Sequence, residues 1–174
     1  LLITTNAGLW RYLIGDTVTF TSKYPFRIQI TGRTRNYINV CGEEIIEDNS
    51  NQAIKKACAE TNSIIKEYTA APYISEDKKP IGHEWVIEFE QEPTDKDLFV
   101  KLLDSALKTE NSDYEAKRYK DLILKTPVVN FVKDGTFMRW LTEKNKLGGQ
   151  HKVPRLKNSR EVIDEILKHA NILE

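Results

Sequence analysis

Hydrophobic and polar residues alternate through the first 32 residues, which indicates a series of short β-strands. Val18 and Phe20 alternate with threonines, and Phe26, Ile28 and Ile30 continue the period-two pattern after a break. Two further candidate strands are residues 1–5 and 9–14, with a turn signal between them. Three or four strands of this length form only a marginal sheet by themselves. We therefore expect this segment to pack against another part of a longer protein.

Beyond Tyr37 the pattern mixes helical periodicity with longer strands. The expected strands cover 63–75, 84–90 and 127–132, with short segments at 37–40 and 43–46. The expected helices cover 49–60, 94–109, 113–123 and 135–145, followed by a last helix. We assign Asn49 and Thr94 as the N-caps of the first two helices and Asn158 as the N-cap of the last. We predict an α+β fold in which helices flank a small, mostly antiparallel sheet. We place a domain boundary between residues 1–34 and residues 35–174.

The balance of charges limits the classes of partner. The chain has 26 Lys and Arg and 26 Asp and Glu among 174 residues, so its formal net charge is zero. This balance argues against a protein that binds nucleic acid by neutralising many phosphates. No apolar stretch approaches the roughly 20 residues that span a bilayer, so we expect no membrane partner. Cys41 and Cys58 lack metal-ligand spacing, so we expect reduced thiols in a cytoplasmic protein.

The chain opens with Leu1-Leu2-Ile3-Thr4-Thr5, without a methionine or a polar lead-in. Strand-like character at the first residue suggests a segment cut from a longer polypeptide, although a processed native terminus would look the same. We expect an N-terminal domain of the same chain to precede it.

The first candidate site residue is Asp16, in the motif Tyr12-Leu13-Ile14-Gly15-Asp16. A carboxylate that follows a glycine between two strands can project past the edge of a sheet. The two oxygens of a carboxylate can accept hydrogen bonds from both hydroxyls of a ribose. The structural alternative is an ordinary Asx-type turn.

The second candidate is Arg33, which follows Gly32 at the predicted domain boundary. A guanidinium presents a planar fork of five donors that suits a nucleotide. Gly42 marks a tight turn further along the same motif. A surface arginine in a hairpin is the structural alternative for Arg33.

The third candidate is Lys152, in a loop that contains Gly148-Gly149, His151 and Arg155. An ammonium on such a loop can contact both a carboxylate and a phosphate while negative charge develops between them. A solvated basic loop is the alternative for this motif.

Taken in order, the motifs resemble those of the adenylate-forming superfamily, which contains acyl-CoA synthetases, luciferases and peptide-synthetase adenylation domains. The chain shares with it Tyr12-x-x-Gly15-Asp16, then Gly32-Arg33 with Ile38 and Gly42-x-x-Ile45, then a C-terminal loop lysine. Residues 4–16, 111–118 and 150–155 resemble more specifically the acyl-acid amido synthetases, a family first known from auxin-responsive plant genes. The resemblance covers nearly the whole chain.

The resemblance implies that the parent enzyme uses ATP and Mg²⁺ to convert a carboxylic acid into an acyl-adenylate, with release of pyrophosphate. The amine of an amino acid then attacks, giving an amide and AMP. By position, Asp16 would bind the ribose hydroxyls, Arg33 would lie against ribose or phosphate, and Tyr12 would help to shape the nucleotide pocket. Lys152 would be the catalytic lysine that bridges the acyl carboxylate, the ribose oxygen and the α-phosphate.

The resemblance also implies a moving domain. The superfamily rotates its C-terminal domain about a hinge two residues after the motif arginine, which is Arg35 here. Many relatives carry Asp or Lys at that point, so Arg35 departs from the commonest pattern. Residues 1–34 would then be the β-rich tail of the N-terminal adenylation domain, and residues 35–174 the mobile domain. The superfamily's phosphate-binding loop lies upstream, so we expect this chain alone to be inactive.

Two alternatives remain open from the sequence. One is an acyl- or aryl-CoA ligase of the same superfamily, and the other is a non-catalytic α+β binding module. We assign no metal ligands in the chain. His83 beside Glu84 could form an acid–base pair, but a turn histidine leading into a strand is the simpler interpretation, and Trp85 and Trp140 are expected in the core.

Overall fold

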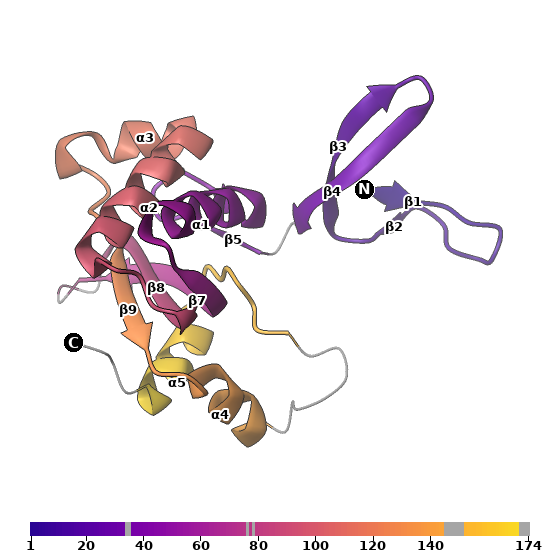
Figure 1. Cartoon of the computed structure of the whole chain (residues 1–174). Helices are drawn as coiled ribbons and strands as arrows, with labels where there is room; N and C mark the ends of the chain where they lie inside the picture. Colours follow the sequence, from indigo (N-terminus) through magenta and orange to yellow (C-terminus); the bar gives the residue numbers. More distant parts are fainter. Residues whose placement is uncertain (34–35, 76, 78, 145–151, 171–174) are drawn as a thin grey trace.

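The computed structural model describes residues 1–33, 36–75, 77, 79–144 and 152–170 (Figure 1). Its N-terminal strands form a long arm that stands apart from a mixed body of helices and sheet. The predicted α+β class is confirmed.

The arm consists of two antiparallel pairs. The short strands β1 (Leu2–Ile3) and β2 (Tyr12–Leu13) form one pair, and β3 (Asp16–Lys23) and β4 (Phe26–Arg33) form the other. Val18 lies opposite Ile30 and Phe20 opposite Ile28, so the predicted alternation holds. Phe20 is 62% exposed and Ile30 is 65% exposed. The apolar face of this hairpin is therefore uncovered in the chain.

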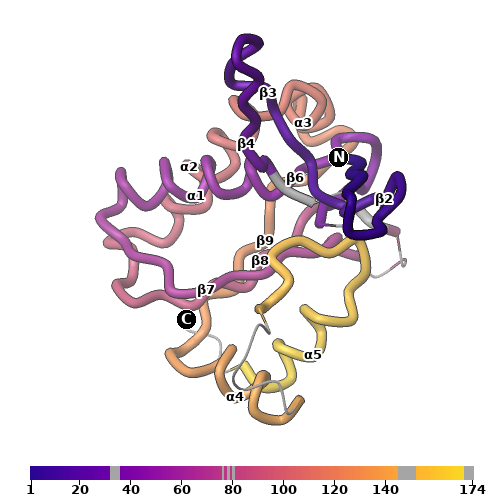
Figure 2. The backbone as a smooth tube through the Cα atoms, turned by 90° about the vertical axis from the view of Figure 1, so that its right-hand side faces the viewer, coloured from indigo at the N-terminus to yellow at the C-terminus, as the bar shows by residue number. Residues whose placement is uncertain are grey.

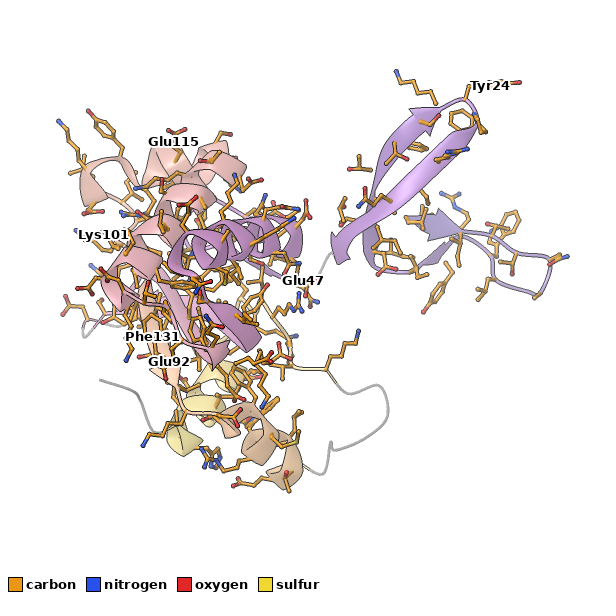
Figure 3. The ribbon with its side chains drawn as sticks, in the orientation of Figure 1. Tyr24, Glu47, Glu92, Lys101, Glu115 and Phe131 are labelled. Atoms are coloured by element: carbon orange, nitrogen blue, oxygen red, sulfur yellow. The ribbon has the colours of Figure 1, made fainter. Side chains whose placement is uncertain are left out.

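A third antiparallel pair of strands, which is also short, joins the arm to the body. It consists of β5 (Tyr37–Ile38) and β6 (Ile45–Ile46). Ile38 and Ile45 are fully buried and belong to the main core. Asn36 donates to Glu47 at the start of α1 over 3.0 Å, which secures the chain where it enters the body. Figure 3 shows Glu47 on the side of the body that faces the arm and Tyr24 at the far tip of the arm.

The body is built on a three-stranded sheet in the order β7-β8-β9. Strands β7 (Ile64–Ile74) and β8 (Pro80–Gln91) are antiparallel, whereas β9 (Val128–Val132) is parallel to β8. The parallel pair is possible because two helices separate β8 from β9 in the chain. Strand β8 begins four residues earlier than predicted, at Pro80 rather than Glu84.

Helices cover both faces of this sheet (Figure 2). On one face lie α1 (Glu47–Thr61) and α2 (Lys96–Glu110), followed by α3 (Ser112–Lys117) and the 3₁₀ turn η1 (Tyr119–Asp121). On the other face lie α4 (Thr136–Glu143) and α5 (Glu161–His169). Trp85 and Ile87 point into the first core and Val86 into the second. Because both faces are buried, β8 shows no clean polar alternation. The burial of Trp85 and Trp140 is confirmed.

The predicted helix caps are wrong in each case. Helix α1 starts at Glu47, and Asn49 reaches back from its third position to accept from the N–H of Ile46. Asp95, rather than Thr94, caps α2 by accepting from the N–H of Leu98. Asn158 lies ahead of α5, whose N-cap position is taken by Arg160, and it accepts instead from the N–H of Asn39.

The helix predicted over 113–123 ends at Lys117 because Arg118 turns into the interior. Its guanidinium forms two hydrogen bonds of 2.8 Å with the carboxylate of Asp104 in α2. Tyr114 donates a third hydrogen bond to Asp104 over 2.7 Å. The buried ion pair between Arg118 and Asp104 therefore ends the helix earlier than its sequence pattern predicts.

Candidate functional site

Asp16 and Arg33 lie directly opposite each other at the base of the β3–β4 hairpin. Asp16 begins β3 after Gly15, whose φ of 85° is readily adopted by glycine. In the antiparallel register Asp16 pairs with Arg33, and Thr17 pairs with Gly32. Residues opposite each other in such a register are direct neighbours across the two strands. The hairpin thus brings the two predicted nucleotide residues together, at the end of the arm nearest the body (Figure 1).

Tyr12 occupies the neighbouring strand pair. It lies in β2, its register partner is Ile3, and its ring is 52% exposed. The exposed ring has room to contact a bound molecule, and β2 is separated from Asp16 by only Ile14 and Gly15.

Two parts of the predicted site lie outside the described residues. These are Arg35, the predicted hinge, and residues 146–151 of the lysine loop. Lys152 itself is described and its side chain is exposed.

Lys152 begins the segment that leads into α5. Figure 1 shows this segment beside the body and not on the hairpin arm. The next residue, Val153, is buried in the second core with Trp140 and Ile163. The exposed side chain of Lys152 therefore directly precedes a residue whose burial in the core holds the backbone in place.

Lys152 also lines a cavity of about 270 Å³ between this segment and the two helices α4 and α5. Lys144 Nζ lies 2.6 Å from one carboxylate oxygen of Glu165, and Trp140 Nε1 donates to the other over 3.0 Å. The cavity is thus polar and holds both signs of charge. Its lining residues are Trp140, Lys144, Lys152, Pro154, Glu161, Val162 and Glu165.

The carboxylate of Glu67 lies within the electrostatic reach of Lys152 and Arg155. Burial raises the pKa of Glu67, and the two cations partly offset this effect. Glu67 also accepts from the N–H of Tyr68 over 3.1 Å. Lys152 therefore has an acidic group as well as solvent in its surroundings.

The loop between β5 and β6 is held by a buried pair that the sequence did not reveal. Glu43 Oε1 lies 2.8 Å from His83 Nε2, and both side chains are fully buried. The N–H groups of Val40 and Cys41 donate to the same carboxylate at 2.7 and 2.8 Å. Burial alone would raise the pKa of Glu43, but these hydrogen bonds lower it to about 2. Burial likewise raises the pKa of the Cys41 thiol to about 11, so this thiol is not activated.

The interpretation of His83 as a turn residue or as the partner of Glu84 is wrong. His83 lies inside β8 and bonds to Glu43, whereas Glu84 accepts from Arg160 at 2.7 Å and from Asn130 at 2.8 Å. Partners 40 residues apart in the chain leave no local pattern in the sequence. The one available signal was Glu43 itself, a carboxylate directly after Gly42 in a stretch that also contains the apolar residues Val40 and Ile45.

Two absences hold for the part of the chain that the structure describes. It contains no group of three or more His, Cys, Asp or Glu side chains arranged to hold a metal ion. It also contains no helix long and apolar enough to cross a membrane.

Comparison with known protein families gives two matches. The profile of the GH3 family C-terminal domain matches residues 48–161, and that of the GH3 family central domain matches residues 1–33. No curated protein sequence matches the chain.

Similar solved structures include two acyl acid amido synthetases. One is titled GH3.15 acyl acid amido synthetase, with a TM-score of 0.76 and 18% sequence identity over 99% of this chain and 33% of that chain. The other is titled AtGH3.15 acyl acid amido synthetase in complex with 2,4-DB, with a TM-score of 0.74 and 18% identity over 99% of this chain and 32% of that chain. At this identity the likeness shows a shared fold. The chain spans about a third of the length of these structures.

Proposed function

The chain belongs to the GH3 family, and from this premise we propose that it is the C-terminal part of an ATP-dependent acyl acid amido synthetase. The parent protein would adenylate a carboxylic acid and transfer the acyl group to the amine of an amino acid. One observation carries the proposal: the profiles of both the central and the C-terminal domain match, in order, within a single chain. This order supports a domain junction near Arg33 and Arg35.

Each predicted site residue has a role in this proposal. Asp16 binds the ribose hydroxyls, Arg33 lies against the ribose or a phosphate, and Tyr12 helps to enclose the nucleotide. The pairing of Asp16 with Arg33 at the base of the β3–β4 hairpin, and the place of Tyr12 in the preceding strand pair, support these roles. Lys152 bridges the acyl carboxylate and the α-phosphate during adenylation, and its exposure beside a fixed backbone supports that role. Arg35 is the proposed hinge between residues 1–34 and 35–174.

The cofactors of the parent enzyme would be ATP and Mg²⁺. In this proposal Asp16 and Arg33 supply the ribose site, and the described residues contain no His, Cys, Asp or Glu cluster arranged for a metal ion. Mg²⁺ would therefore rely on the phosphates of ATP and on residues upstream of this chain. For the same reason the chain alone would not catalyse the reaction. Free thiols at Cys41 and Cys58 support a cytoplasmic setting.

The test compares two lysine variants of the parent protein. Lys152→Ala is expected to lower acid-dependent pyrophosphate release by about 100-fold or more, because it removes a cation from the site of developing charge. Amide formation from a supplied acyl-adenylate should change far less. Lys144→Ala is the matched control, because Lys144 lines the same cavity but is already paired with Glu165.

Three results would contradict the proposal. Equal losses in both half-reactions would remove Lys152 from the adenylation step. Equal effects of Lys144→Ala and Lys152→Ala would show only that the cavity needs positive charge. Turnover with coenzyme A but with no amino acid would assign the parent to the acyl-CoA ligases instead.

A further inference from the structure

The segment that follows Lys152 is attached to the edge of the sheet by backbone hydrogen bonds. The N–H of Ala70 in β7 donates to the carbonyl of Arg155 over 2.8 Å, and the N–H of Lys157 donates to the carbonyl of Ala70 over 3.0 Å. Ala70 and Leu156 form a parallel bridge at this point. The segment therefore acts as a short additional strand beside β7.

Thr69 adds a side-chain attachment closer to Lys152. Its hydroxyl donates to the carbonyl of Pro154 over 2.7 Å, and the residue is only 1% exposed. Pro154 lies two residues after Lys152. This partly buried hydrogen bond fixes the direction of the backbone, because breaking it would leave the carbonyl without that partner.

Arg155 attaches the same segment to helix α1. Its guanidinium carbon lies 5.2 Å from the centroid of the Tyr68 ring, within the range of a cation–π contact. Its Nη1 donates to Asn51 over 2.7 Å, and the Tyr68 hydroxyl donates to the same oxygen over 2.8 Å. Arg155 thus connects the segment, the sheet and the helix on the side opposite to the buried Val153.

We propose that Thr69 and Arg155 are positioning residues that set the place from which Lys152 reaches the reacting groups. This inference rests on the proposed function of Lys152. The two attachments lie two and three residues beyond Lys152, so they hold its backbone relative to the sheet without touching the substrate. Thr69 lies outside the motifs that point to the nucleotide, in a strand 83 positions before Lys152, whereas Arg155 belongs to the same loop motif as Lys152.

Thr69→Val provides a sharp perturbation, because valine has nearly the same shape but no hydroxyl. The carbonyl of Pro154 would lose its partner, and the adjoining backbone would shift. Displacing a catalytic group by about 1 Å can cost about 100-fold in rate. We therefore expect the kcat of adenylation in the parent protein to fall by about 10- to 100-fold. Transfer from a supplied acyl-adenylate, which does not need Lys152, should stay within about threefold of the unsubstituted protein.

Thr69→Ser is the matched control, since serine keeps the hydroxyl. It should restore most of the adenylation rate. A merely structural role for Thr69 would lower both half-reactions together and would not depend on the hydroxyl. If Thr69→Val does not fold, Arg155→Met tests the same inference, because it removes the bond to Asn51 from a side chain at the surface.

Hydrogen exchange on the 174-residue chain provides a readout without catalysis. In Thr69→Val, the amide of Lys157 should exchange about tenfold faster or more, while the amide of Ile87 in the central strand should keep its protection. Lys152→Ala distinguishes the proposed function of Lys152 from the positioning role of Thr69 and Arg155. If Lys152→Ala leaves adenylation unchanged, the proposed function fails. If Lys152→Ala abolishes adenylation but neither Thr69→Val nor Arg155→Met lowers it beyond twofold, the positioning role is overturned.

Discussion

Replacing Glu43 with glutamine removes a negative charge from a carboxylate that is fully buried beside His83. The hydrogen bonds from His83 and from the backbone of Val40 and Cys41 lower the pKa of Glu43 from 4.5 to about 2, against the opposing effect of burial. A difference of about 2.5 pKa units corresponds to about 3 kcal/mol, since one unit is worth about 1.4 kcal/mol. Glu43→Gln should therefore lower the free energy of unfolding by about 3 kcal/mol at pH 7.

The sign of the pH dependence follows from the lowered pKa of Glu43. The folded state binds the proton of Glu43 less readily than the unfolded state, so this stabilisation is fully present above about pH 4.5 and is lost as the pH falls towards 2. About 2 kcal/mol of it should be gone by pH 3. The difference in free energy between the unsubstituted protein and Glu43→Gln should shrink by that amount between pH 7 and pH 3.

Urea unfolding at a series of pH values measures this difference. Glu44→Gln is the matched control, because it makes the same chemical change at the next residue, which is exposed. It should alter the free energy of unfolding by less than about 0.5 kcal/mol. The reasoning would be refuted by a loss below about 1 kcal/mol for Glu43→Gln at pH 7, or by a loss that is the same at pH 3.

Other substitutions test the remaining buried charges by unfolding measurements at pH 7. Asp104→Ala should cost about 3–5 kcal/mol, because it leaves the buried guanidinium of Arg118 with only the exposed carboxylate of Asp121 as an ionic partner; a loss under about 1 kcal/mol would contradict this. Glu88→Gln should cost about 1–3 kcal/mol, since the carboxylate of Glu88 accepts from two N–H groups at the start of α4. Lys66→Ala, which removes the exposed partner of Glu88, should lower the free energy of unfolding much less than Glu88→Gln does. Equal losses for Glu88→Gln and Lys66→Ala would show that the salt bridge, and not the helix start, is the stabilising contact.

The sequence predicts those elements whose pattern is local. Val18 and Phe20 alternate with polar residues, so β3 is recognisable from its own residues. The starts of the helices depend on which nearby side chain reaches a free N–H, and several candidates lie within three residues of each other. Asn49 illustrates this: its amide does bond at the start of α1, but from inside the helix. The end of α3 depends on Asp104, which lies in another helix, so no local pattern predicts it.

The candidate site also combines residues that the sequence predicts with residues whose partners lie far away in the chain. Motif order alone predicts Asp16 and Arg33, and the hairpin register then explains why these two residues meet. The position of Lys152 depends on Thr69, and the position of the loop before β6 depends on His83. These partners are separated by 83 and 40 positions along the chain, so only the folded structure reveals them.

The register of the hairpin arm affects how far its length can change. Asp16 and Arg33 form its root, whereas Tyr24 lies at the opposite end (Figure 3). Side chains alternate between the two faces of a strand, so adding or deleting one residue on each strand near the tip leaves every pair below it unchanged. The arm could therefore grow or shrink by such steps during evolution while Asp16 and Arg33 remain register partners at its base.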